Sequence, residues 1–213
     1  MKNFDLSVQR FDEFAAEYAQ RFMALNTYSD SIDRFCDWIG SEHPRILELG
    51  CGPGNVTRLL KLRFPESQIT AIDLAPQMIE IANNNLPDVD FIVMDVRDIS
   101  IIPVKFDAIM CSFCLPFLSK ADSVKLISDC AERLVSGGVL YVSTMEGNEE
   151  RAGFETTSFS GNAEIYFNYH RQADLEQAFV QSGFEIRQAK LQDYIEPDGS
   201  ATTDMIFIAV KQN

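Results

Sequence analysis

The sequence predicts a single α/β domain built on a doubly wound, seven-stranded sheet that is mostly parallel, with an antiparallel C-terminal hairpin and helices on both faces. Two observations carry this prediction. After Pro44, short and nearly continuous apolar runs alternate with amphipathic stretches, a pattern typical of parallel strands joined by right-handed helical crossovers. The chain has 213 residues, 46% of them hydrophobic, which is enough for one sizeable core and too few for two ordinary domains.

The first forty residues are expected to form a cap of two helices. Apolar side chains recur at helical spacing from Phe11 to Leu25 and again from Ile32 to Ile39. Polar residues separate the two stretches, and Gly40 is a suitable stop for the second.

From residue 45 onward, strands and helices are expected to alternate. The predicted strands cover residues 45–48, 68–72, 90–94, 106–110, 139–144, 184–193 and 204–211. The predicted helices cover residues 56–64, 76–84, 121–135 and 172–182. The last two strands flank the turn sequence Glu196-Pro197-Asp198-Gly199, which favours an antiparallel hairpin. No break in composition divides the chain, so residues 1–213 are predicted to be one domain with a helical cap at 1–40.

The charge balance excludes some classes of partner. Eighteen Lys and Arg against 32 Asp and Glu give a net charge of −14, which weighs against nucleic acid and anionic membranes because phosphate binding depends on basic side chains. The N-terminus lacks the apolar stretch of a secretory signal, and no apolar run approaches the roughly 20 residues of a membrane span. We therefore expect a cytoplasmic protein with no nucleic-acid or membrane partner. The oligomeric state stays open, a homodimer included.

The five cysteines do not follow a disulfide or metal pattern. Cys111 and Cys114 have the CxxC spacing, but a structural zinc site needs a second pair, which Cys36, Cys51 and Cys130 do not supply. A redox pair would open a helix, whereas this pair follows an apolar strand. We expect reduced, mostly buried thiols and no metal.

A glycine-rich loop and two aspartates mark a candidate ligand site. Gly50, Gly52 and Gly54 follow the first predicted strand, where they allow positive φ and close approach of the backbone to a ligand. A tight turn that happens to be rich in glycine would look the same. However, Asp73 ends the second strand, where a carboxylate can accept hydrogen bonds from both ribose hydroxyls, and Asp95 ends the third. The carboxyl ends of parallel strands share one edge, so the features together predict a nucleotide-type cofactor site.

A nicotinamide or flavin dinucleotide is the competing ligand. Its G-x-G-x-x-G fingerprint needs a small residue three positions after the second glycine, where this chain has Asn55. The chain has no Tyr-x-x-x-Lys pair, which small one-domain reductases use, and its length leaves no room for the second domain of a larger dehydrogenase. An NAD-dependent oxidoreductase is therefore the weaker alternative.

Several segments resemble class I S-adenosylmethionine-dependent methyltransferases of the small-molecule type. Residues 46–54, Ile-Leu-Glu-Leu-Gly-Cys-Gly-Pro-Gly, resemble the first motif of that family, its most specific part. Further similar segments cover the second, third and fifth strands, the N-terminal helix and the region before the sixth strand; they are residues 71–82, 91–96, 134–142, 11–18 and 169–184. The resemblance implies a Rossmann-like fold, S-adenosyl-L-methionine as cofactor, and methyl transfer to an oxygen or nitrogen atom of a small molecule.

The resemblance also implies roles for individual residues. The implied cofactor contacts are Tyr18, Glu48, Gly50, Cys51, Gly52, Asn55, Asp73, Leu74, Met78, Asp95, Val96, Cys111, Ser112 and Phe113. Among them, the backbone of Gly50 and Gly52 would lie against the methionine part of the cofactor and Asp73 would hold the ribose. Asp95 and the Val96 amide would read the adenine edge.

Methyl transfer from a sulfonium is an in-line displacement, in which a protein contributes mainly alignment and exclusion of water. A base is needed only if the attacking atom must lose a proton. His170, one of two histidines in the chain and placed before the last predicted helix, is the candidate general base. A hydrogen-bonded structural histidine would look the same. A cofactor-binding regulatory protein without catalysis also stays open.

The connection at residues 145–170 is too long for an ordinary link of about 2–6 residues. It begins with a polar, glycine-bearing stretch and then becomes aromatic, with Phe154, Phe159, Tyr166, Phe167 and Tyr169. Because it emerges at the edge of the cofactor site, we expect a hydrophobic lid insertion that closes over the transferable methyl together with the N-terminal helix. Some of these rings could instead belong to the core as an added strand.

Overall fold

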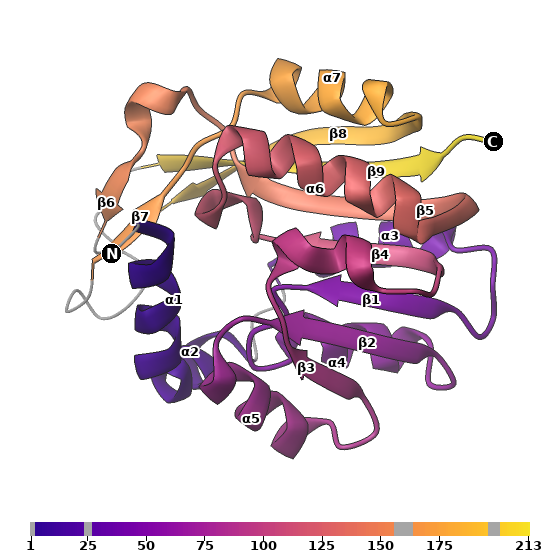
Figure 1. The fold of residues 1–213 in the computed structure, drawn as a ribbon, viewed down its shortest axis with the longest axis horizontal. Helices are drawn as coiled ribbons and strands as arrows, with labels where there is room; N and C mark the ends of the chain where they lie inside the picture. The colour runs from indigo at the N-terminus through magenta and orange to yellow at the C-terminus, as the bar shows by residue number, and fades with distance from the viewer. Residues whose placement is uncertain (1–2, 24–26, 156–163, 196–200) are drawn as a thin grey trace.

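The computed structural model describes residues 3–23, 27–155, 164–195 and 201–213. A seven-stranded sheet in the order β3-β2-β1-β4-β5-β9-β8 forms its centre (Figure 1). The strands are β1 Arg45–Leu49, β2 Gln68–Asp73, β3 Asp90–Val93, β4 Phe106–Ser112, β5 Leu134–Met145, β8 Phe184–Ile195 and β9 Ala201–Lys211. Only β9 runs against its neighbours, pairing antiparallel with both β5 and β8. The predicted fold class is therefore confirmed, including the antiparallel C-terminal hairpin; its turn at 196–199 lies outside the described residues.

Helices cover both faces of the sheet, as the crossover connections require. On one face lie α6 Lys120–Arg133 and α7 Gln172–Gln181, with the short 3-10 helix η1 Val96–Ile101. On the other face lie α3 Ser29–Trp38, α4 Asn55–Arg63 and α5 Pro76–Asn85.

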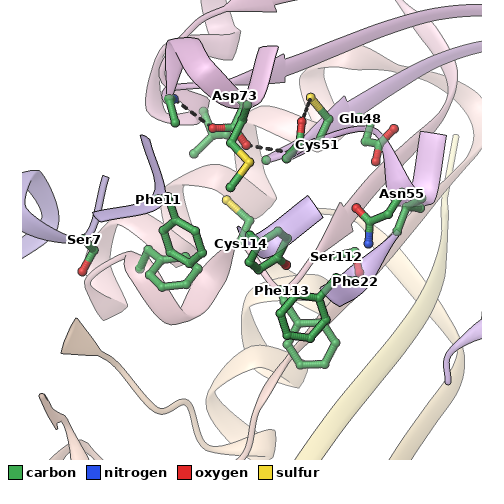
Figure 2. A pocket seen from close by; sticks show the side chains of 18 of the residues that line it. Ser7, Phe11, Phe22, Glu48, Cys51, Asn55, Asp73, Ser112, Phe113 and Cys114 are labelled. Atoms are coloured by element: carbon green, nitrogen blue, oxygen red, sulfur yellow. Dashed lines mark hydrogen bonds between the residues drawn. The ribbon is translucent and has the colours of Figure 1, made fainter. Parts of the chain in front are cut away.

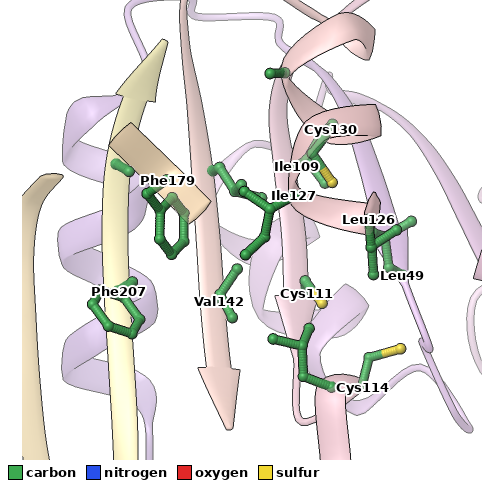
Figure 3. Packing of buried hydrophobic residues seen from close by; sticks show 14 of the residues in the cluster. Leu49, Ile109, Cys111, Cys114, Leu126, Ile127, Cys130, Val142, Phe179 and Phe207 are labelled. Carbon is green, nitrogen blue, oxygen red and sulfur yellow. The ribbon is translucent and has the colours of Figure 1, made fainter. Parts of the chain in front are cut away.

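Each face has its own hydrophobic core because successive strand residues point to opposite sides. Leu47 and Leu49 of β1 pack toward α6, whereas Ile46 packs toward α3 and α4. Figure 3 shows the first core, where Leu126 and Ile127 of α6 and Phe179 of α7 meet the sheet; all three are at most 2% exposed. These two cores hold the carboxyl ends of the strands in fixed register.

The helical cap differs from its prediction. Two helices, α1 Asn3–Glu13 and α2 Ala15–Phe22, replace the single helix expected around Phe11–Leu25. The break falls at Phe14, whose φ of −106° and ψ of 21° leave the helical region. The apolar spacing continues through the break, so periodicity alone could not reveal it. Leu25 lies outside the described residues, as do the rest of 24–26.

The long connection after β5 contains two short strands, whose positions the sequence did not predict. β6 Gly153–Glu155 and β7 Ile165–Phe167 pair as a separate two-stranded antiparallel sheet, preceded by the 3-10 helix η3 Glu149–Arg151. Strands of three residues are too short to give a recognisable alternation. Phe159 and the rest of 156–163 lie outside the described residues.

Among the described helices, none is both long and apolar enough to cross a membrane.

Candidate functional site

A cavity of about 330 Å³ opens at the carboxyl edge of the sheet (Figure 2). Its walls come from the segments that follow β1, β2, β3 and β4, from the start of β9, and from α1, α2, α3 and the β6–β7 sheet. This is the edge at which open α/β sheets bind ligands, and the volume is in the range of small-molecule sites.

The glycine loop between β1 and α4 bends sharply into this cavity. Gly52 has a φ of 53° and Gly54 a φ of 87°, values that side chains with a Cβ rarely adopt. Gly54 is the N-cap of α4, and a Cβ there would lie 3.4 Å from Leu86 Cδ1, an ordinary contact distance. The positive φ, rather than lack of space, therefore favours glycine at position 54, and Gly52 lines the cavity.

Asp73 at the end of β2 holds this loop in place. Its Oδ2 accepts a hydrogen bond from the Gly52 amide at 2.8 Å, and its Oδ1 accepts one from the Ala75 amide at 2.9 Å. Burial raises the pKa of Asp73, although these amide donors oppose the rise. Each carboxylate oxygen has two acceptor positions, so the same group can still accept hydrogen bonds from a ligand.

Glu48 is a buried carboxyl group beneath the loop. It is 2% exposed, and Thr57 of α4 donates a hydrogen bond to its Oε2 at 2.6 Å. Burial is the main cause that raises the pKa of Glu48 to about 8, and the nearby charge of Asp73 adds to it. The raised pKa favours the protonated form of Glu48 at neutral pH.

Asp95 is already engaged by its neighbour Arg97. The Asp95 carboxylate accepts hydrogen bonds from the Arg97 amide at 2.9 Å and from the Arg97 guanidinium. Burial alone would raise the pKa of Asp95, but Arg97 outweighs it and holds that pKa below its ordinary value. Asp95 thus caps η1 and presents Val96 to the cavity.

The end of β4 carries a strained residue. Phe113 has a φ of 51°, rare for a residue with a bulky side chain. Its amide donates hydrogen bonds to the Ser143 carbonyl at 3.0 Å and to Ser143 Oγ at 3.1 Å, which stabilise this conformation. Its ring centroid lies 4.9 Å from that of Tyr28, and both residues line the cavity. Strain of this kind is often found at ligand sites.

The structure brings together nearly all of the predicted cofactor residues. Thirteen of the fourteen line the cavity; the exception is Cys111, which is 1% exposed and packs in the core on the α6 side. Cys114, three residues later, lines the cavity instead, because the chain leaves β4 in a turn that brings it against Gly50. All five cysteines are reduced and buried. Contact of these residues with a cofactor stays a prediction.

His170 does not lie in this cavity. It is 4% exposed, lines a second cavity beside α6 and α7, and its Nε2 lies 3.0 Å from the Leu115 carbonyl. A carbonyl only accepts, so Nε2 carries the proton. Burial lowers the pKa of His170, which favours the neutral ring. This position does not support the general-base role expected from the sequence.

Several residues of the cavity wall were not predicted from the sequence. Tyr28 of α3 and Asp204 of β9 meet there, with the Tyr28 hydroxyl donating to Asp204 Oδ2 at 2.6 Å. Glu155 of β6 also lines it and accepts a hydrogen bond from Tyr169. In the sequence, the only hint of this part of the cavity is Asp204, an aspartate at the start of an otherwise apolar strand. No sequence pattern indicates that four distant segments meet at the cavity.

Comparison with known proteins gives a consistent result. A family model described as a methyltransferase domain matches residues 46–138. The demethylmenaquinone methyltransferase of Thermotoga maritima is 30% identical over 139 residues, covering 64% of this chain and 60% of that protein. The malonyl-(acyl-carrier protein) O-methyltransferase of Acetivibrio thermocellus is 31% identical over 169 residues, covering 78% of this chain and 52% of that protein.

The fold has a close counterpart among solved structures. The crystal structure of magnesium protoporphyrin IX methyltransferase from Synechocystis PCC 6803 with bound SAM superposes with a TM-score of 0.72 at 14% identity, covering 100% of this chain and 98% of that one. The chain spans 60% and 52% of the lengths of the two curated relatives. The family match ends at residue 138 and so contains the glycine loop, Asp73 and Asp95, but neither Tyr28 nor Asp204.

Proposed function

The chain belongs to the class I S-adenosylmethionine-dependent methyltransferase family, and from this premise we propose that it transfers a methyl group from S-adenosylmethionine to an oxygen or nitrogen atom of a small molecule. The observation that carries the proposal is the hydrogen bond between Asp73 and the Gly52 amide inside the cavity. This hydrogen bond joins the loop after β1 to the carboxylate at the end of β2, and such a cofactor requires both.

The residues present fit this cofactor. Asp73 offers carboxylate oxygens to a ribose diol, and the side chains of Leu74 and Met78 line the cavity where the adenine would lie. Because Arg97 already engages Asp95, we assign the adenine edge to the Val96 amide. Glu48 lies below the loop on which the positively charged methionine end would rest. When bound, the cofactor supplies an electrophilic methyl group on a sulfonium.

The protein's own contribution is positioning and exclusion of water. The Phe113 ring, whose backbone amide is held by Ser143, forms a wall near the end of β4. The cavity is also lined by the rings of Phe11 of α1, Phe117, and Phe167 of β7. The ring centroids of Phe11 and Phe117 lie 5.0 Å apart. These rings shield the reacting atoms from solvent. No proton is routed through His170, whose Nε2 is bonded to the Leu115 carbonyl.

The test is turnover. Purified protein is incubated with S-adenosylmethionine and a metabolite extract, and mass spectrometry follows both S-adenosylhomocysteine and compounds that gain one methyl group. We expect both products to appear together. Binding of the cofactor without either product would favour a regulatory protein, and preferential binding of NADH would favour an oxidoreductase.

A further inference from the structure

The described lining of the cavity is rich in aromatic side chains. It contains seven of them, which are Phe11, Tyr18, Phe22, Tyr28, Phe113, Phe117 and Phe167. All but Phe167 are only partly buried, whereas Phe106 and Phe207 in the core on the α6 side are 0% exposed. Partly open apolar side chains that gather in one cavity are typical of a ligand site. The rings therefore indicate a ligand that covers them.

Five of these residues lie outside the set that we predict to contact the cofactor; they are Phe11, Phe22, Tyr28, Phe117 and Phe167. Phe117 belongs to the 3-10 helix η2 Leu115–Phe117, and its ring centroid lies 5.0 Å from that of Phe11 and 5.5 Å from that of Phe167. The planes of these two pairs are inclined by 80° and 45°. Rings inclined in this way can offer both a face and an edge to a further aromatic ring, which are the contacts that such rings prefer.

The rings and the carboxyl groups of the cofactor end occupy different parts of the cavity. In Figure 2 the labelled rings of Phe11 and Phe113 lie apart from the carboxyl groups of Asp73 and Glu48. A ligand on the rings can therefore be bound next to the cofactor without displacing it from Asp73.

The carboxyl groups of the described lining are hydrogen-bonded within the protein. Asp204 accepts the Tyr28 hydroxyl at 2.6 Å, and Glu155 accepts the Tyr169 hydroxyl. The other three, which are predicted cofactor contacts, have the partners described above; they are Glu48, Asp73 and Asp95. Arg21, the one basic side chain of that described lining, is exposed. A buried charge on an acceptor would need a partner of its own, and the acidic groups of this wall already have theirs.

We propose that the methyl acceptor is an uncharged aromatic compound that packs among the rings of Phe11, Phe117 and Phe167. The inference rests on the proposed function and adds the class of acceptor. An uncharged aromatic acceptor removes the open ring surfaces from water and gains ring-to-ring contacts beyond the burial of apolar area. A charged acceptor of the same size loses its hydration without gaining a dedicated partner.

The experiment is a calorimetric titration of the protein, first with S-adenosylhomocysteine alone and then, with that ligand present, with four probes built on the same two-ring skeleton. The probes are 2-naphthol, its saturated analogue decahydro-2-naphthol, the anion 2-naphthoate and the cation 2-naphthylmethylammonium. We expect 2-naphthol to bind at least about tenfold more tightly than either charged probe. We also expect it to bind about two- to tenfold more tightly than the saturated alcohol, as ring-to-ring contacts imply.

Two variants with the same substitution separate ring contacts in the cavity from general effects of losing a ring. Phe117→Leu keeps an apolar side chain, so it should reduce the preference for 2-naphthol over decahydro-2-naphthol to below about twofold while leaving the affinity for S-adenosylhomocysteine within about twofold. Phe154→Leu is the matched control. Phe154 belongs to β6, is 47% exposed and is not among the described residues that line the cavity, so the preference should be unchanged.

Equal or tighter binding of either charged probe would overturn the inference, as would equal or tighter binding of the saturated alcohol. No binding of 2-naphthol while S-adenosylhomocysteine binds would count against this inference alone. Failure of S-adenosylhomocysteine to bind would count against the proposed function and, with it, the inference. An unchanged preference in Phe117→Leu, or a loss of it in Phe154→Leu, would refute the assigned contacts. If Phe117→Leu does not fold, Phe11→Leu replaces it with the same expected result.

Discussion

At the residue scale, the carboxyl groups that we propose bind or support the cofactor also hydrogen-bond to the loops around the cavity. Asp73 accepts the amides of Gly52 and Ala75, and Glu48 accepts the Thr57 hydroxyl. Both carboxyl groups have pKa values raised mainly by burial. Substitutions there should therefore change ligand binding and stability in ways that can be measured separately.

Asp73→Ala should weaken binding of S-adenosylmethionine by about 1.5–3 kcal/mol for each charge-assisted hydrogen bond lost to the ribose. It also releases two backbone amides, so stability should fall as well. Calorimetry measures the first effect and thermal unfolding the second. Asp107→Ala is the control, because Asp107 also accepts a backbone amide, from Arg45 at 2.7 Å, but at the opposite end of β1. Equal affinity of wild type and Asp73→Ala would contradict the ribose assignment.

Glu48→Gln should change how stability depends on pH. Burial raises the Glu48 pKa from 4.5 to about 8, so in this window the folded protein keeps a proton that the unfolded chain has released. The free energy of unfolding of the wild type should thus fall, relative to Glu48→Gln, as pH rises from about 5 to about 8. Gln keeps an acceptor for Thr57. Urea unfolding at several pH values measures the difference, and a difference that stays constant with pH would refute the assigned cause.

At the scale of elements, two segments far apart in the chain pack against each other beside the cavity. Ser7 of α1 accepts a hydrogen bond from the Tyr166 amide of β7 at 3.2 Å. Phe11, Phe14 and Tyr18 pack against a cluster that includes Phe167 and Tyr169. Among the described rings of the connection, Phe167 and Tyr169 thus belong to a small core, and Phe167 also lines the cavity. Closure of the connection as a lid stays a prediction.

We predict that these segments act as a lid. On binding of S-adenosylhomocysteine, residues 10–25 and 145–170 should gain protection from hydrogen exchange together, because each forms part of the surface that the other covers. The last turn of α6, at the opposite end of that helix from the Lys120–Glu149 ion pair, is the internal control and should not change. Full protection of both segments without ligand, or a response of only one, would show that they are ordinary core.

At the scale of the whole molecule, the net charge of −14 bears on the class of partner. Nucleic-acid binding depends on lysine and arginine contacts to phosphate and weakens steeply with salt. We therefore predict that gel-shift titrations at low salt will show no retention of DNA or RNA. Micromolar retention that disappears as salt is added would contradict the prediction and indicate a basic surface that the overall charge conceals.

Much of the architecture could be predicted because local rules act within short segments. Strand and helix positions from residue 45 onward follow from apolar periodicity, and the glycine loop with Asp73 follows from the need for positive φ and a carboxylate at a strand end. The break at Phe14 and the strands β6 and β7 could not be predicted, because three residues or one dihedral change leave no periodic signal.

The sequence by itself determined the fold class and the overall charge, which depend on local periodicity and composition, and it predicted which strand-end residues meet at one end of the cavity, because the carboxyl ends of parallel strands share an edge. Only the tertiary structure decided that Cys114 lines the cavity in place of Cys111, that His170 faces Leu115 and not the cavity, and that Tyr28 meets Asp204. Tyr28 and Asp204 are 176 positions apart in the sequence. Contacts between residues so far apart depend on the order of the strands in the sheet and on how the helices pack against it, and no local sequence pattern encodes these.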